Sequence, residues 1–166
     1  MRLDLTAMTT RKHPEGTRCF EERGMTHLDA DVQQLIELAT QAAEHAWCPY
    51  SRFRVGAAIE TADGSVFSGC NVENASSGLT ICAERNAVFQ AVAAGHTKIR
   101  RVVVFTPTQT PTAPCGACRQ VLSEFSDDAE ALCVCLGPDS ISTTLAELLP
   151  MRFGPGNLDQ GRVSQA

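Results

Sequence analysis

The stretch RVVVFTPTQTPTAPCGACRQVLSEFSDDAEALCVCL, residues 101–136, decides the fold class. It begins with a Val- and Phe-rich run at 101–106 that does not alternate with polar residues, a pattern typical of a strand buried on both faces. A Thr- and Pro-rich loop at 107–114 follows, then a helix with an apolar stripe near Cys115–Phe125 and a second buried strand at 131–136. Strand, helix and strand in this order predict a right-handed crossover between parallel strands, and therefore an α/β fold.

The rest of the chain adds helices and a hairpin around this unit. We expect, in chain order, a helix from about Asp29 to Trp47 that Pro49 ends, a β-hairpin of residues 55–60 and 65–71 around Asp63-Gly64, a helix from about Cys82 to Ala94, and a short helix opened by a capping box at Thr144 and Glu147. The residue pattern by itself thus predicts four strands.

Length and composition limit the domain organisation and the partners. We expect a poorly ordered polar extension at residues 1–24, with Met25 as an alternative start, one folded domain at 25–158 and a flexible tail at 159–166. The N-terminus lacks the apolar core of a secretory signal, and no apolar run reaches the roughly 18 residues of a membrane span, so we expect a cytoplasmic protein with no membrane partner. A net charge of −5 and an aromatic content of 5% favour a small ligand over nucleic acid.

Three of the eight cysteines have a spacing that indicates chemistry. Cys82 opens one expected helix, and Cys115 and Cys118 open another; helix N-termini favour thiolate, the form that binds metal. Because both helices adjoin strands of one sheet, their starts are expected side by side. Three thiolates with no evident fourth ligand suit a catalytic zinc site that keeps one position open for water. Glu84, two residues after Cys82, is placed to move protons without binding the metal.

Other interpretations of the cysteines remain open at this point. Pro-Cys-x-x-Cys alone is also found in redox pairs and in structural zinc sites, but a redox pair leaves Cys82 and Glu84 unexplained. A structural site needs a fourth ligand, for which His45 and His96 are candidates without ligand-like spacing. Four other cysteines are expected to be packing residues: Cys48, Cys70, Cys133 and Cys135.

Several motifs together resemble the zinc nucleoside deaminases, and most closely the small homotetrameric cytidine deaminases. The matching stretches are Cys48-Pro-Tyr-Ser-Arg-Phe53 with Val55-Gly-Ala-Ala58, Asn71-Val-Glu-Asn74, Cys82-Ala-Glu-Arg85, Pro114-Cys-Gly-Ala-Cys-Arg-Gln120 and Phe153-Gly-Pro155. They extend from about Asp29 to Leu158. The resemblance implies a three-layer α/β/α sandwich around a mixed five-stranded sheet and a homotetramer with shared active sites.

The resemblance also implies a role for individual residues. At the metal, Cys82, Cys115 and Cys118 would bind one Zn²⁺ per chain, Glu84 would be the catalytic proton shuttle, and Arg85 would hydrogen-bond the zinc thiolates. At the base, Phe53 would stack on the pyrimidine and the Ala83 N–H would meet the base carbonyl. Asn71 and Glu73 would bind the ribose hydroxyls, and Phe153 would enter a neighbouring subunit's pocket. One departure is Ser77, which stands where the family commonly has a tyrosine that reaches a neighbour's sugar site.

The function that the resemblance implies is hydrolytic deamination of cytidine and 2′-deoxycytidine to uridine and 2′-deoxyuridine, a reaction of pyrimidine salvage. Two alternatives stay open. Ser77 leaves room for a sister deaminase acting on a modified cytosine nucleoside such as blasticidin S. A non-catalytic, zinc-stabilised binding module would instead need a closed four-ligand site and would have no need of Glu84.

Overall fold

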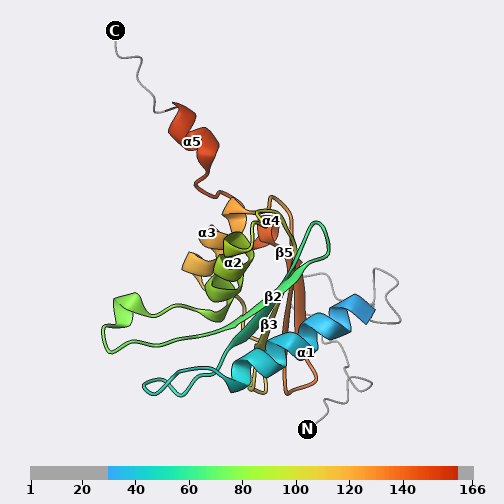
Figure 1. Ribbon diagram of the computed structural model, residues 1–166, viewed down its shortest axis with the longest axis vertical. Helices are drawn as coiled ribbons and strands as arrows, with labels where there is room; N and C mark the ends of the chain where they lie inside the picture. Colours follow the sequence, from blue (N-terminus) through green and yellow to red (C-terminus); the bar gives the residue numbers. More distant parts are fainter. Residues whose placement is uncertain (1–29, 161–166) are drawn as a thin grey trace.

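A computed structural model of the chain describes residues 30–160 and shows one mixed five-stranded sheet with helices on both faces (Figure 1). In chain order the elements are α1 (Ala30–Glu44), β1 (Gly56–Thr61), β2 (Val66–Cys70), the 3₁₀ helix η3 (Ser77–Leu79), α2 (Ala83–Ala93), β3 (Ile99–Thr106), α3 (Gly116–Glu124), β4 (Glu130–Cys135), β5 (Ser140–Thr144), α4 (Leu145–Leu148) and α5 (Pro155–Gln160). The expected α/β class and mixed sheet are confirmed.

The strands lie in the order β2-β1-β3-β4-β5. The expected hairpin is present, with β1 and β2 antiparallel and Gly64 in the left-handed region at φ 85° in the turn between them. β3 and β4 are parallel and joined through α3, as the 101–136 stretch predicts. β1 with β3 and β4 with β5 are antiparallel.

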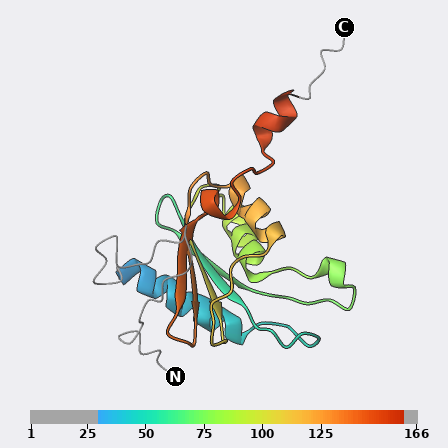
Figure 2. The ribbon, with the colours of Figure 1, turned by 180° about the vertical axis from the view of Figure 1, so that it is seen from behind.

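The sheet separates two apolar cores, which makes three layers. α1 covers one face of the sheet (Figure 2). Leu35 and Ile36 of α1 belong to the same buried cluster as Val103 of β3. The other face packs on α2 and α3, with Val88 and Leu122 fully buried there. α1 lies so close to β1 that a Cβ on Gly56 would overlap the Ala39 carbonyl. Since α2 and α3 share one face, their N-termini can meet at the same end of the sheet.

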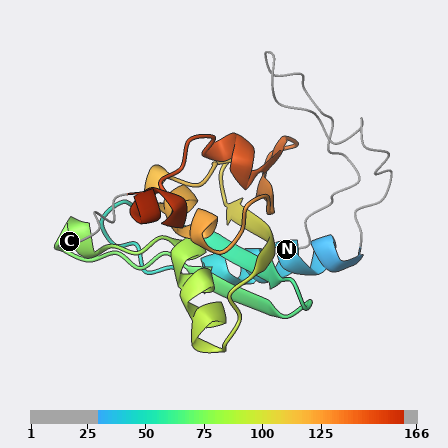
Figure 3. The ribbon, with the colours of Figure 1, turned by 90° about the horizontal axis from the view of Figure 1, so that it is seen from above.

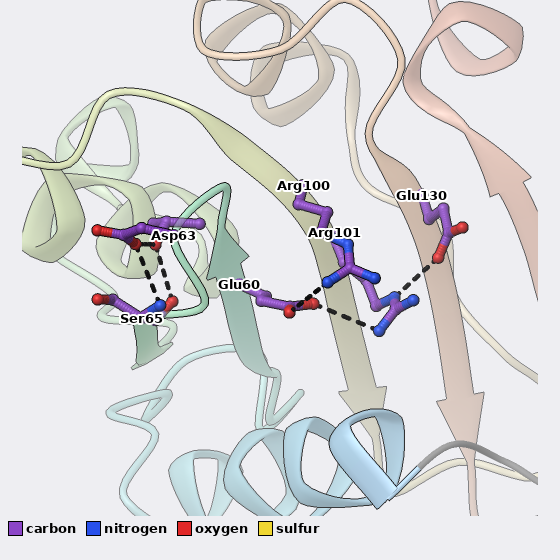
Figure 4. Close-up of polar contacts among 7 residues, drawn as sticks. Glu60, Asp63, Ser65, Arg100, Arg101 and Glu130 are labelled. Carbon is purple, nitrogen blue, oxygen red and sulfur yellow. Dashed lines mark hydrogen bonds and ion pairs between the residues drawn. The ribbon is translucent and has the colours of Figure 1, made fainter.

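Three polar side chains form a ladder across the α1 face of the sheet. Glu60, Arg101 and Glu130 lie directly opposite one another on β1, β3 and β4. Arg101 bonds the carboxylates on both sides, at 3.3 Å from Nη1 to Glu60 and 2.8 Å from Nε to Glu130 (Figure 4). Arg100 makes a second ion pair with Glu60 at 3.0 Å. We call Glu60, Arg101 and Glu130 the ionic ladder; its cross-strand bonds favour this strand register.

Three elements were not evident in the residue pattern. β5 is polar and half-buried, so its sequence, Ser140–Thr144, lacks the apolar run that marks β4. No helix was expected after the one opened by Thr144, but α5 begins at Pro155, a residue suited to the first helical position. The 3₁₀ helix η3 lies at the outer end of a protruding loop (Figure 3).

Some expectations fall outside the described residues. The expected extension 1–24 and the alternative start at Met25 lie there, as does most of the expected tail 159–166. Within residues 30–160, no helix has both the length and the apolar character needed to cross a bilayer.

Candidate functional site

Three cysteine side chains come together where α2 and α3 begin. Cys82 is the N-cap of α2, Cys115 is the N-cap of α3, and Cys118 lies in the first turn of α3. Their Sγ atoms all lie within 4.8 Å of one another, at 3.9 Å between Cys82 and Cys115 and 3.5 Å between Cys115 and Cys118. A tetrahedral zinc ion with Zn–S bonds of about 2.3 Å places its sulfurs about 3.8 Å apart. The three thiols, here called the thiol cluster, therefore fit a zinc ion.

The thiol cluster is the single group of three metal-ligating side chains that converges within residues 30–160. His45 and His96, the candidates for a fourth ligand, are not part of it. His96 instead contacts Asp63 at 3.1 Å, in the hairpin turn. A closed structural site with four protein ligands is therefore absent from the described part of the chain, and an open position is left for water or substrate.

The pKa values of the Cys82 and Cys118 thiols are shifted in opposite directions. A hydrogen bond from Cys118, helped by Arg85, lowers the pKa of Cys82 to about 5. The pKa of Cys118 is raised, first by that same hydrogen bond with Cys82 and then by burial. Cys82 therefore ionises more readily than Cys118. Binding of a cation would release the thiol proton of Cys118.

Arg85 provides the positive charge beside the thiol cluster. Its Nη2 atom donates to the Thr80 carbonyl at 3.0 Å and to the Cys82 sulfur at 3.6 Å. Its pKa is raised, chiefly by the hydrogen bond to Cys82. Within residues 30–160, Arg85 Nε is the one buried side-chain nitrogen or oxygen without a hydrogen-bond partner. Because three thiolates exceed the charge of Zn²⁺ by one, a guanidinium at this position fits the donor set.

Glu84 is buried next to the thiol cluster. It is the second residue of α2, and only 4% of it is exposed. Burial raises the pKa of its carboxyl group, and the negative charge on Cys82 adds to this effect. A hydrogen bond from its own backbone N–H, and then one with Cys118, oppose the rise in pKa. A carboxyl group in such surroundings holds a proton more readily than one in water, as a general acid–base group must.

A short hydrogen-bonded arrangement links the thiol cluster to the turn that contains Phe53. Val72 pairs with Ile81, the residue before Cys82, through two backbone hydrogen bonds of 2.9 and 3.0 Å. On its other side the same segment bonds Trp47, through Asn71 O at 3.0 Å and Glu73 N at 2.7 Å. Residues 71–73 therefore lie between the start of α2 and the chain that leads into the turn of residues 50–55.

Asn71 and Glu73 lie on this central segment, and their side chains already have partners. The Asn71 amide bonds the backbone of Phe53 and Val55. The Glu73 carboxylate accepts hydrogen bonds from the backbone N–H groups of Tyr50 and Ser51. The Ser51 side chain, and after it these two N–H groups, lower the pKa of Glu73. Each side chain retains polar capacity for a further partner, since an amide has two donors and a carboxylate about four acceptor sites.

Ala83 and Phe153 lie in contrasting places. Ala83 is fully buried and is the first residue of α2, where backbone N–H groups lack intrahelical partners. Phe153 is 60% exposed, in the segment that leads to α5, and its carbonyl accepts a hydrogen bond from Gln120 of α3. α5 stands away from the body of the molecule (Figure 1). The structure therefore gives Phe153 no buried position within its own chain.

Two residues of the site were not singled out from the sequence. Ser51 donates its backbone N–H to Glu73, and its hydroxyl accepts a hydrogen bond from the backbone N–H of Phe53. Arg119 bonds the Pro114 carbonyl at 2.8 Å and the Leu148 carbonyl at 3.0 Å, and so holds the turn before Cys115. Both residues lie inside the quoted motifs, which was the available signal. Each also has one partner that is distant in sequence, Glu73 for Ser51 and Leu148 for Arg119, and spacing does not reveal it.

Comparison with known proteins gives one consistent family. The model of the family described as "cytidine and deoxycytidylate deaminase zinc-binding region" matches residues 29–134. The cytidine deaminase of Halalkalibacterium halodurans is 48% identical over 124 residues, which cover 74% of this chain and 94% of the relative. The cytidine deaminase of Sporosarcina psychrophila is 43% identical over 129 residues, covering 77% and 95%.

Solved structures agree with the sequence relatives. The crystal structure of cytidine deaminase from Burkholderia pseudomallei aligns with a TM-score of 0.70 and 48% identity, covering 73% of this chain and 98% of that one. Cytidine deaminase from Mycobacterium tuberculosis aligns with a TM-score of 0.66 and 41% identity, covering 76% and 99%. The similarity therefore extends over nearly the whole length of these proteins.

Proposed function

The chain belongs to the cytidine and deoxycytidylate deaminase family with its zinc-binding region, and we propose on that premise that it deaminates cytidine and 2′-deoxycytidine to uridine and 2′-deoxyuridine. The observation that supports this most is the meeting of the thiol cluster with the buried Glu84 at the starts of α2 and α3. A structural zinc module has no use for such a carboxyl group. The reaction consumes water and releases ammonia, and we place it in pyrimidine salvage.

Cys82, Cys115 and Cys118 are the residues that would hold the zinc ion. A zinc ion bound by three thiolates supplies Lewis acidity that makes water a nucleophile near neutral pH. Arg85, bonded to Cys82 Sγ, offsets the negative charge of the thiolates and so preserves that acidity. Elemental analysis of protein purified without chelator is expected to give one zinc per chain.

Glu84 would move the protons. Its carboxylate takes a proton from the attacking water and delivers it to N3 of the base while the water oxygen bonds to C4. It then transfers the second proton to the 4-amino nitrogen, and the C4–N bond breaks to release ammonia. The raised pKa of Glu84 favours this exchange, because a buried carboxyl group both accepts and returns a proton at moderate cost.

The remaining proposed contacts position the nucleoside. Phe53 would stack on the pyrimidine, the Ala83 N–H at the start of α2 would donate to the base carbonyl, and Asn71 and Glu73 would bind sugar hydroxyls. Phe53 is 40% exposed, so its ring is accessible to a ligand. The hydrogen-bonded segment 71–73 supports this assignment, since it connects the turn of Phe53 with the residue before Cys82.

We propose further that the protein is a cytoplasmic homotetramer with shared active sites. Exposed apolar residues support an assembly: Phe89 and Val92 on α2, Leu79 in η3, and Met151, Phe153 and Leu158 near α5. Phe153 has no buried position in its own chain, as expected of a residue that enters a neighbour's pocket. Light scattering is expected to give four chains per particle, and Phe153→Ala subunits in mixed oligomers are expected to impair wild-type neighbours.

The decisive experiment is an ultraviolet assay of cytidine conversion by the zinc-loaded protein. A panel with cytidine, 2′-deoxycytidine and blasticidin S separates the proposed activity from a sister deaminase. Ser77, exposed in η3, is the residue that makes this comparison necessary. Turnover of blasticidin S without turnover of cytidine would overturn the proposal, and so would the absence of any turnover at full zinc occupancy.

A further inference from the structure

The turn of residues 50–55, which contains Phe53, is fixed by side chains of the segment next to it. Asn71 Oδ1 accepts a hydrogen bond from Val55 N at 2.8 Å, and Asn71 Nδ2 donates to the Phe53 carbonyl at 2.9 Å. Glu73 Oε2 accepts hydrogen bonds from Tyr50 N at 2.9 Å and from Ser51 N at 3.2 Å. The two side chains proposed to meet the sugar therefore also hold the backbone on both sides of the proposed stacking ring.

Ser51 joins these contacts into one network. Its backbone N–H donates to Glu73 Oε2 at 3.2 Å, and its hydroxyl accepts a hydrogen bond from the Phe53 N–H at 3.0 Å. A continuous path of two hydrogen bonds thus leads from the Glu73 carboxylate through Ser51 to the backbone of Phe53.

The backbone between these contacts is in an uncommon conformation. Arg52, which lies between Ser51 and Phe53, has φ 57°, and it is the one non-glycine residue with positive φ within residues 30–160. Such a conformation is uncommon for non-glycine residues and persists where surrounding bonds hold it. The Arg52 N–H is bonded to the Cys48 carbonyl at 3.0 Å, so the turn is held from its own start as well.

We propose that Ser51 is a positioning residue for base binding, which transmits the position of the Glu73 carboxylate to Phe53 and so couples sugar binding to stacking of the base. The inference rests on the proposed function, in which Phe53 stacks and Glu73 binds the sugar. In this proposal Glu73 Oε2 keeps its hydrogen bonds to Tyr50 and Ser51, and Glu73 Oε1 binds a sugar hydroxyl. Ser51 acts through Phe53 and does not itself contact the substrate.

The test is a double-mutant cycle between Ser51→Ala and Phe53→Leu. Loss of the hydroxyl frees the Phe53 N–H, and we expect KM for cytidine to rise about three- to tenfold with a smaller change in kcat, because stacking contributes to substrate and transition state alike. In the Phe53→Leu background the same change is expected to alter kcat/KM less than about twofold. Ser51→Thr keeps the hydroxyl and is expected to retain near-normal KM.

A matched serine separates this role from a general effect of the substitution. Ser140 lies in β5, at the opposite edge of the sheet from β2, so Ser140→Ala is expected to leave KM unchanged. All variants are compared at equal zinc content and with thermal unfolding measured. Additive losses in the cycle, or a Ser51→Ala variant as active as Ser140→Ala, would overturn the inference while leaving the proposed function intact.

Amide hydrogen exchange provides a measurement that does not depend on turnover. In Ser51→Ala the Phe53 amide is expected to exchange at least several-fold faster than in the wild type, and in Ser51→Thr at the wild-type rate. If the wild-type protein does not convert cytidine, the proposed function fails, and unchanged exchange at Phe53 would then reject the positioning role as well.

Discussion

Two buried glutamates at opposite ends of the sheet show how similar burial leads to different chemistry. Glu60 in the ionic ladder is 5% exposed and Glu84 beside the thiol cluster is 4% exposed. Glu60 has two arginine partners, Arg100 and Arg101 (Figure 4). Glu84 has no ion pair among the described residues, and burial raises its pKa. A buried carboxylate matched by cations keeps its charge, and removing its partner is costly. Burial without an ion pair raises the pKa of a carboxyl group, and we propose that Glu84 uses this property to exchange protons.

Glu84→Gln gives the largest expected effect on activity. The amide occupies the same space and forms hydrogen bonds but cannot carry a proton. We expect kcat for cytidine to fall by about 10²–10⁴-fold or more. Zinc content and Tm are expected to remain close to wild type, because the substitution removes a buried ionisable group without leaving a cation unpaired. Turnover within a few-fold of wild type would exclude Glu84 as the proton shuttle.

Arg101→Met removes a partner of Glu60 and gives the largest expected effect on the free energy of unfolding. The apolar side chain leaves Glu60 and Glu130 without their shared partner, and breaking a buried ion pair on one side costs about 3–5 kcal/mol. We expect a loss of about 3 kcal/mol in the free energy of unfolding, near the lower end because Arg100 still bonds Glu60. Urea unfolding measures it, and kcat/KM of the folded fraction is expected to remain unchanged.

Arg100→Met is the matched control for that experiment. The Arg100 side chain is 56% exposed, against 7% for Arg101, and exposed ion pairs contribute only about 0–1 kcal/mol. Equal losses for the two variants would show that burial does not determine the strength of the ionic ladder. A loss of catalysis in Arg101→Met at full folding would show that the two ends of the sheet are coupled.

Glu73 extends the comparison to a carboxylate bonded by backbone N–H groups. Because this charge lies where the sugar is proposed to bind, a substrate phosphate is expected to be repelled. The loops 74–80 and 107–114 contain no Lys or Arg to receive one, and Arg54 is bonded to the Glu44 carbonyl at 2.6 Å. We expect kcat/KM for cytidine to exceed that for cytidine monophosphate by about tenfold or more. Free cytosine and a cytosine-containing oligonucleotide are expected to be poorer still, and equal rates for the monophosphate would contradict the assignment of Glu73.

The smallest expected effect concerns an exposed carboxylate, Asp63 in the hairpin turn. Hydrogen bonds, chiefly from Thr61 and then from Ser65, lower its pKa to about 2. Its contribution to stability is therefore present above the unfolded-state pKa of about 4 and is lost as the pH falls toward 2. Asp63→Asn is expected to lower Tm slightly at pH 7. The difference from wild type is expected to shrink between pH 4 and pH 2, and a difference that grows over this range would contradict the assignment.

Local sequence patterns predicted most of the secondary structure but not all of it. The Val- and Phe-rich run became β3, and Thr144 opens α4 with the expected capping box. β5 escaped prediction because its residues are polar and half-buried, so that pairing with β4, not hydrophobic pattern, makes it a strand. The fifth strand had been expected only through the resemblance.

The sequence predicted the metal-binding part of the site but not the contacts that hold the turn of Phe53. Helix N-caps and the motif spacing pointed to Cys82, Cys115, Cys118 and Glu84 as one constellation, since each position is defined by near neighbours. The resemblance named Asn71 and Glu73 as sugar ligands. The tertiary structure adds that both already hold the turn of Phe53, and that Ser51 completes the contact. The bonds of Asn71 and Glu73 to this turn join residues about 20 positions apart, which spacing alone does not specify.

The sequence by itself determined the α/β class, the two cysteine-bearing helix starts and the carboxylate between them, because helices, strands and caps depend on residues a few positions apart. Only the tertiary structure decided which of these groups meet. Cys82 and Cys115 are 33 positions apart, and Glu60 and Arg101 are 41 apart. The sheet order and register bring each pair together. The resulting burial and neighbouring charges make Glu60 an ion-pair partner and raise the pKa of Glu84, which we propose as the proton carrier.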